Sequence, residues 1–102
     1  MLFKKIIFIF FLIFSSSVFA DDKMVLGLEA YNNKVQCATC HTLQAAGSVG
    51  NIGPNLDQLK PSMLQIIYAV NNGIGVMPAW EGILTDEEIE AVAYYVFSST
   101  NR

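Results

Sequence analysis

Basic residues and histidine are scarce in this chain. Its 102 residues include six lysines and arginines, nine aspartates and glutamates, and a single histidine. The basic residues form no stripe that would neutralise a row of phosphates, which argues against binding to nucleic acid. Alternating apolar and polar residues over strand lengths are also missing, so a β-sheet is not expected as the main scaffold.

Cysteine is almost as rare, and both cysteines lie close to the histidine. Residues 37–41 read Cys-Ala-Thr-Cys-His. On a helical turn, this spacing lets two thiols reach two vinyl groups along one porphyrin edge, and the next residue then points under the ring. The pattern C-x-x-C-H is typical of covalent haem attachment. The sequence therefore predicts one haem c, bonded to Cys37 and Cys40, with His41 as an axial ligand of the iron.

Three other structures would use the same residues. A thioredoxin-like redox pair needs a βαβ context and a lowered thiol pKa, and no strand–helix–strand pattern occurs nearby. A zinc site would need a carboxylate or a water to complete its ligands, because the chain has no further cysteine or histidine. A disulfide between Cys37 and Cys40 would close too short a loop to constrain the unfolded chain much. Together these observations favour haem.

The first twenty residues have the pattern of a secretory signal peptide. Two lysines precede an apolar run over residues 6–14, and Val18-Phe19-Ala20 forms a small-residue cleavage pattern before Asp21. The run is shorter than the roughly 20 residues that span a bilayer. We therefore expect residues 1–20 to be cleaved, with an uncleaved anchor as the alternative. Export to the periplasm also fits the motif, because bacteria attach haem to cysteines outside the cytoplasm, where free thiol pairs tend to oxidise.

Cleavage changes both the size and the charge of the chain. Removal of residues 1–20 from 102 leaves 82 residues, enough for one domain over residues 21–102. Such a domain buries only about 60–65% of its unfolded surface, so a large apolar cofactor would add to its core. Residues 21–102 then contain four basic and nine acidic residues, which gives a formal charge of −5. This acidity fits either a basic redox partner or ordinary solubility, and no stable membrane insertion is expected.

Apolar periodicity and capping residues predict three longer helices around the motif. The glycine-rich residues 44–56 are predicted to form a loop. Gly27 lowers helix propensity by about 1 kcal/mol relative to alanine, so we expect another backbone to pass close to it. The helices are expected near residues 21–33, 62–73 and 85–97, and the last two open with the capping boxes Ser62/Gln65 and Thr85/Glu88.

The second axial ligand of the iron determines the kind of function. An open position would bind gases or peroxide, whereas a filled position favours electron transfer. A thioether ligand favours the reduced iron and raises its potential. Met24 and Met63 lie at apolar helix positions, where methionine is usually a gap-filler. Met77 instead lies outside the helices, after two glycines that let the backbone bend and before Pro78, which stiffens it. We therefore predict that His41 and Met77 ligate the iron.

These motifs, in this order, resemble a small monohaem class I cytochrome c of bacterial type. The resemblance rests on His41, the runs Gly53-Pro54-Asn55-Leu56 and Met77-Pro78-Ala79-Trp80, and the helix over residues 89–96, and it covers nearly the whole mature chain. It implies an all-α class I cytochrome c fold, with three to five helices wrapped around one covalently attached haem. The first and last helices would cross near Gly27 and Tyr31 on one side and Val92 and Tyr95 on the other.

The resemblance also implies roles for three residues around the haem. Pro54 would offer its carbonyl to the far nitrogen of His41, which fixes the imidazole and makes it a better donor; a plain turn proline is the alternative. Leu56 would line the haem pocket. Trp80 would pack near the haem propionates, although a lone tryptophan is as often a core residue.

The function implied is that of a periplasmic carrier of single electrons between redox proteins, and not of an enzyme. Such a protein would be a monomer or would form transient complexes with its electron donor and acceptor. One alternative is a dedicated haem c subunit of a periplasmic oxidoreductase complex, such as a molybdenum or sulfur-compound dehydrogenase. The other is an enzyme or gas sensor with an open iron site.

Overall fold

A computed structural model describes the chain from residue 18 to residue 102, with side chains described from residue 21. The predicted signal segment lies almost entirely outside the described residues. The expected cleavage point after Ala20 falls in the first turn of helix α2 (Val18–Glu29). Among the described helices, none is long and apolar enough to cross a membrane.

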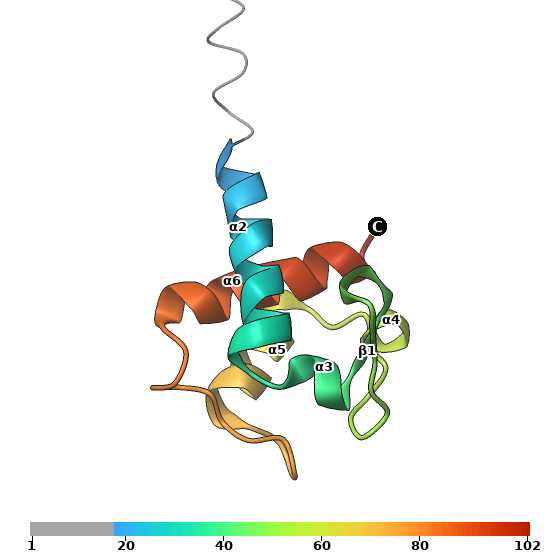
Figure 1. Cartoon of the computed structure of the whole chain (residues 1–102). Helices are drawn as coiled ribbons and strands as arrows, with labels where there is room; N and C mark the ends of the chain where they lie inside the picture. The colour runs from blue at the N-terminus through green and yellow to red at the C-terminus, as the bar shows by residue number, and fades with distance from the viewer. Residues whose placement is uncertain (1–17) are drawn as a thin grey trace, which may run out of the picture.

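Helices α2 and α6 (Asp86–Thr100) cross and form the frame of the fold, as Figure 1 shows. Gly27 of α2 lies at the close approach of the two helices. A Cβ placed on Gly27 would lie 2.3 Å from the carbonyl oxygen of Ala91 and 2.6 Å from Cβ of Tyr95. Tyr31 continues the contact, because its ring lies 6.3 Å from that of Tyr95 between centroids. The predicted close approach at Gly27 is therefore present, and a residue without a side chain lets the two backbones meet.

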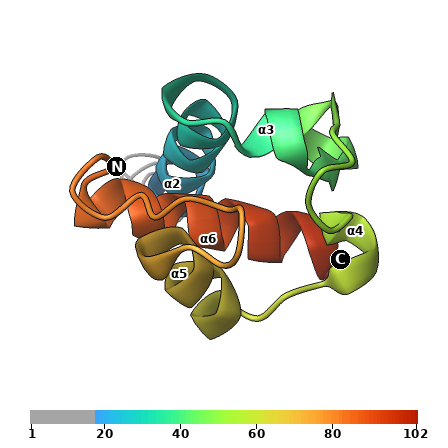
Figure 2. The same ribbon diagram turned by 90° about the horizontal axis from the view of Figure 1, so that it is seen from below.

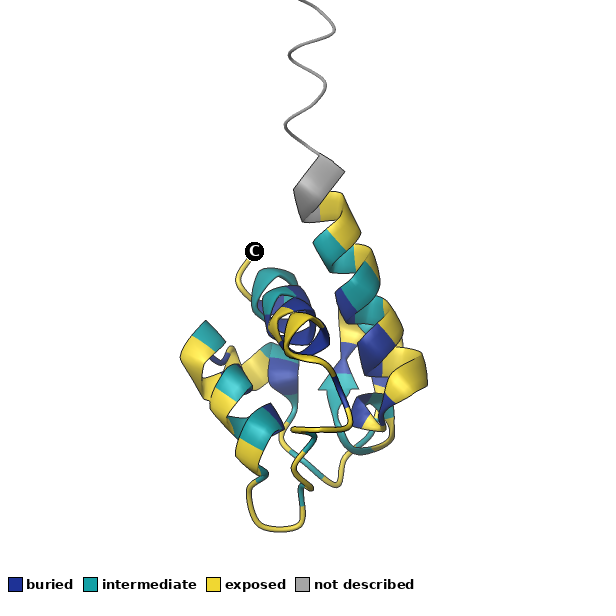
Figure 3. Cartoon of the chain, turned by 90° about the vertical axis from the view of Figure 1, so that its left-hand side faces the viewer, coloured by how far each residue is buried: buried dark blue, intermediate teal, exposed yellow. Residues whose placement is uncertain are grey.

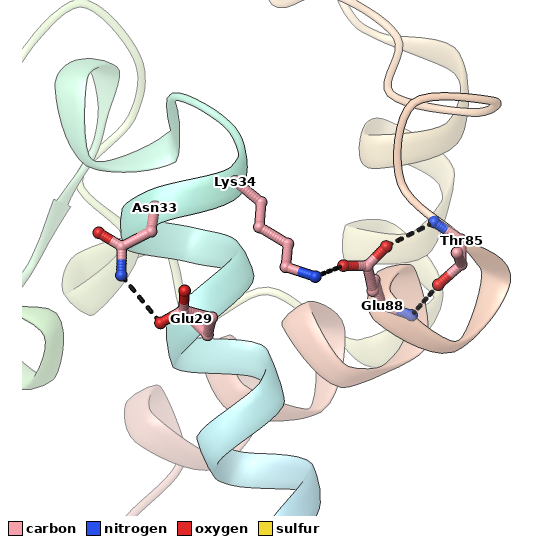
Figure 4. A network of polar contacts seen from close by, with 5 residues as sticks. All are labelled: Glu29, Asn33, Lys34, Thr85 and Glu88. Atoms are coloured by element: carbon pink, nitrogen blue, oxygen red, sulfur yellow. Dashed lines mark hydrogen bonds and ion pairs between the residues drawn. The ribbon is translucent and has the colours of Figure 1, made fainter.

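The segment that carries the cysteines follows α2 through a π-helical turn, η1 (Ala30–Lys34). The turn leads into the one-turn helix α3 (Cys37–Cys40). A salt bridge fixes the end of η1: Lys34 pairs with Glu88, whose carboxylate also accepts a hydrogen bond from the backbone N–H of Thr85 at 2.9 Å (Figure 4). The end of η1, shortly before α3, is thereby tied to the first turn of α6.

A small hairpin follows α3 directly. Strands β1 (Thr42–Leu43) and β2 (Ser48–Val49) pair in antiparallel register and enclose the 3₁₀ turn η2 (Gln44–Ala46). The prediction of a loop over residues 44–56 is therefore wrong in part. Strands of two residues are too short to show alternating apolar and polar residues in the sequence. The chain reverses direction between them at Gly47, whose φ of 70° is in the left-handed region.

Two further helices complete the described fold. The one-turn helix α4 (Leu56–Leu59) starts at Asn55, whose side chain accepts from the N–H of Gln58 at 3.2 Å. Helix α5 (Met63–Asn72) follows, and both predicted capping boxes are present, at Ser62/Gln65 for α5 and at Thr85/Glu88 for α6. Figure 2 shows α5 beside α6, on the other side from α2.

Helix α6 supplies much of the core. Figure 3 shows buried residues gathered along it, where it lies between α5 and α2. Ala91, Val92 and Ala93 are at most 1% exposed. The remaining buried apolar side chains come from η1, α3, β1, α4, α5 and the connecting segments: they include Tyr31, Val35, Cys37, Leu43, Leu56, Ile66, Val70 and Leu84.

Candidate functional site

One cavity of about 800 Å³ opens between α3, the residue 52–61 segment, α5, the residue 74–80 segment and α6. Its volume lies within the roughly 300–1,000 Å³ of pockets that take a cofactor-sized molecule. The structure brings every predicted site residue to the wall of this cavity: Cys37, Cys40, His41, Pro54, Leu56, Met77 and Trp80.

His41 follows α3 and is oriented by the carbonyl of Pro54. The distance from Nδ1 to that oxygen is 2.7 Å. A carbonyl only accepts, so Nδ1 carries the proton and donates it, and in the neutral imidazole the electron pair of Nε2 is then free for a metal. The segment fits closely against the ring, because a Cβ on Gly53 would lie 2.6 Å from Cε1 of His41. The imidazole thus presents Nε2 as a ligand atom in one fixed tautomer.

The two cysteines are free thiols in the structure. Cys37 is buried and Cys40 half-buried. Burial raises the pKa of the Cys37 thiol to about 11, which is opposite to the lowered thiol pKa of a thioredoxin-like redox pair. No group of three His, Cys, Asp or Glu side chains suited to a metal ion occurs within the described part of the chain.

Met77 lies in a closed turn between α5 and α6. Ile74 and Met77 exchange two backbone hydrogen bonds, of 3.1 and 2.9 Å. Gly73, at the end of α5, has a φ of 72°, and a Cβ there would lie 2.5 Å from the carbonyl oxygen of Met77. Further along, the N–H of Trp80 donates to the carbonyl of Val70 at 2.8 Å, which ties the segment back to α5.

The residues present fit a covalently bound haem. The cavity wall carries two thiols spaced for two vinyl groups, an imidazole with a free Nε2, and a thioether sulfur. Apolar side chains of α5 and α6 add to a wall that suits a flat macrocycle: they include Ile66, Ala69, Val70, Val92 and Val96. The chemistry of the donors and that of the wall therefore agree on the same cofactor.

Sequence reasoning missed several residues of this wall. The pairs Ile66/Val70 and Val92/Val96 repeat at helical spacing, which shows that they face inward but not that they face the same cavity. Tyr31 also lines the cavity, although its sequence position marks it only as a packing residue. Nothing in the sequence distinguishes a cavity wall from an ordinary core at these positions.

Comparison with known proteins gives matches over most of the chain. The family model described as "Cytochrome C oxidase, cbb3-type, subunit III" matches residues 23–96. Cytochrome c6 of Tetradesmus obliquus is 36% identical over 88 residues, which cover 76% of this chain and 92% of the relative. Cytochrome c6 of Euglena viridis is 35% identical over 86 residues, with coverage of 74% and 91%.

A solved structure is similar as well. The c-type cytochrome SorU from Sinorhizobium meliloti matches with a TM-score of 0.76 and 55% sequence identity. The match covers 80% of this chain and 95% of that chain. The helical frame described above is therefore shared with an experimentally determined cytochrome.

The fold and the C-x-x-C-H motif at the cavity define a small monohaem class I cytochrome. Its helices enclose the cavity as the sequence predicts, so the all-α class I fold is confirmed. The chain belongs to the cytochrome c family. Proteins of this family carry covalently attached haem c and transfer electrons to redox partners, and Cys37 and Cys40 have the spacing of the attachment motif.

Proposed function

We propose that this protein carries single electrons between redox proteins in the periplasm, with haem c bonded to Cys37 and Cys40 and the iron ligated by His41 and Met77. Bound haem supplies an iron that alternates between two oxidation states. The observation that carries the proposal is that His41 and Met77 line the same cavity. The other two described methionines, Met24 and Met63, do not line it.

Contacts within the chain hold both candidate ligands, His41 and Met77, in place before an electron is transferred. His41 donates Nδ1–H to Pro54, which fixes the ring and strengthens Nε2 as a donor. Met77 lies in a turn closed by two backbone hydrogen bonds, so its sulfur is presented with little backbone freedom. Two fixed ligands in an apolar wall favour a site that changes little on reduction, which suits electron transfer rather than substrate turnover.

The location in the periplasm is supported by the signal-like pattern of residues 1–20 and by the attachment motif. The partners are other redox proteins, which would dock transiently over a small patch.

Trp80 and Leu56 also lie in the wall of the proposed haem pocket. A carrier of this kind needs no reaction at a substrate.

Absorption spectra of the oxidised, haem-loaded protein test the ligand pair. Met77→Ala should lose the weak sulfur-to-iron charge-transfer band, while the matched variant Met63→Ala should keep it, because Met63 lies outside the cavity wall. The reverse pattern would refute the assignment of Met77. A high-spin spectrum with ready carbon monoxide binding in the unsubstituted protein would instead indicate an open iron site.

Purification of the exported protein tests the carrier role itself. The mass should equal residues 21–102 plus one haem, and the protein should be oxidised and reduced reversibly without a tightly bound partner. Co-purification of an oxidoreductase in a fixed ratio would contradict a free carrier and favour the subunit of a complex. Retention of residues 1–20 in the mass would contradict cleavage.

A further inference from the structure

A buried hydrogen bond joins Tyr31 to the hairpin that follows His41. The hydroxyls of Tyr31 and Ser48 lie 2.9 Å apart, and these residues are 1% and 7% exposed. Burial raises the pKa of Tyr31 to about 12, so its hydroxyl stays protonated at physiological pH. The ring is already packed against Tyr95, and phenylalanine would pack there equally well. The Tyr31 hydroxyl is therefore not needed for packing, and its role follows from its hydrogen-bond partner, Ser48.

Ser48 belongs to the strand that pairs back onto the segment after the haem motif. It faces Leu43 in the β1–β2 ladder, and its hydroxyl also reaches the carbonyl of Leu43 at 3.5 Å. Thr42 donates from Oγ1 to the carbonyl of Gly50 at 2.8 Å. The hairpin is thus closed at both ends, and the Tyr31 hydroxyl anchors it to the turn between α2 and α3.

The far end of the hairpin lies directly against the haem motif. A Cβ on Gly50 would lie 2.5 Å from the carbonyl oxygen of Thr39. The N–H of Gly53 donates to the carbonyl of Cys40 at 2.7 Å, and the next residue, Pro54, accepts from Nδ1 of His41. Ser48, which the hydrogen bond to Tyr31 holds, therefore lies only six positions along the chain before Pro54, whose carbonyl orients the His41 imidazole.

We propose that Tyr31 and Ser48 are a positioning pair for His41: their hydrogen bond anchors the hairpin whose continuation carries the Pro54 carbonyl to Nδ1. The inference rests on the proposed function, because it takes His41 as the axial ligand. Neither hydroxyl needs to touch the haem. The pair acts by keeping residues 48–54 against α3, so that the bond from His41 to Pro54 stays closed for more of the time.

Solvent exchange of the His41 Nδ1 proton, measured by NMR on the reduced haem-loaded protein, tests the inference. Loss of a net hydrogen bond raises the open population about fivefold. Tyr31→Phe and Ser48→Ala should therefore each speed exchange of this proton about fivefold and shift the reduction potential in the same direction. The double variant should add little to either single change, since both remove the same bond.

Tyr95→Phe is the matched control, because it removes a hydroxyl from the other ring of the same aromatic pair and leaves the hairpin anchor intact. It should leave the exchange rate and the potential unchanged. Equal effects in Tyr95→Phe and Tyr31→Phe would show a general loss of core packing and overturn the inference. Unchanged exchange in both Tyr31→Phe and Ser48→Ala would also overturn it, even if both variants unfold more easily.

The same measurement separates this inference from the proposed function. Spectra of the wild-type protein in which His41 does not ligate the iron would refute the ligand assignment and the positioning pair together. A ligating His41 without a protected Nδ1 proton would refute the positioning pair alone. A wild-type protein with that proton, combined with unchanged variants, would refute the positioning pair alone. Failure of Met77 as the sixth ligand would leave the Tyr31 and Ser48 result standing.

Discussion

Replacement of Gly27 by alanine should destabilise the protein, although alanine is the better helix former. A methyl group at Gly27 would lie 2.3 Å from the carbonyl oxygen of Ala91, where ordinary contact begins near 3.4 Å. The two helices would have to separate by about 1 Å, and both groups that meet the methyl, Ala91 O and Tyr95 Cβ, belong to or adjoin the backbone of α6. Neither group can rotate out of the way.

The magnitude follows from two opposing terms. Overpacking a well-packed core costs about 1–3 kcal/mol, and a clash with a backbone belongs at the upper end of that range. The gain in helix propensity returns about 1 kcal/mol. We therefore expect Gly27→Ala to lower the free energy of unfolding by about 2 kcal/mol.

Urea denaturation of the haem-loaded protein, followed by far-UV circular dichroism, measures this change. Val25→Ala is the matched control on the same helix, because Val25 is 68% exposed and should change stability by less than about 0.5 kcal/mol. If Gly27→Ala were as stable as the parent protein or more stable, the gain in helix propensity would exceed the cost of the contact with Ala91 and Tyr95. The close crossing of α2 and α6 at this residue would then be refuted.

Three further predictions concern single residues. Lys60 has a φ of 49°, so Lys60→Gly should relieve left-handed strain and raise the free energy of unfolding by about 0.5–1 kcal/mol in the same assay; a fall would contradict this. The hydrogen bond from Lys34, followed by that from the Thr85 backbone, lowers the pKa of Glu88 from 4.5 to about 2. Its contribution to stability should therefore be complete above pH 4.5 and be lost as the pH falls towards 2, and Glu88→Gln should flatten that part of the pH–stability profile. Gly53→Ala should displace the His41 ring, seen by NMR as loss of the protected Nδ1 proton, and retention of that proton would refute the contact.

The sequence was sufficient for features that depend on near neighbours. The capping boxes at Ser62 and Thr85 were predicted correctly, because each joins residues three positions apart. The hairpin over residues 42–49 was missed, because its strands are two residues long and are held by contacts with Tyr31 and Gly50. Local patterns carry no information about such contacts.

By itself, the sequence determined the attachment motif, the candidate ligands and the order of the helices. Those features follow from spacing along the chain, where three or four residues decide which side chains share a face. Only the tertiary structure decided that His41 and Met77 line one cavity. It also placed the Pro54 carbonyl at Nδ1 of His41, a contact that the family resemblance implied but that spacing along the chain could not show. It also decided that a tyrosine hydroxyl anchors the hairpin beside them. The reason is physical: these contacts join segments that are distant along the chain, and the crossing of α2 and α6 and the packing of α5 bring them together.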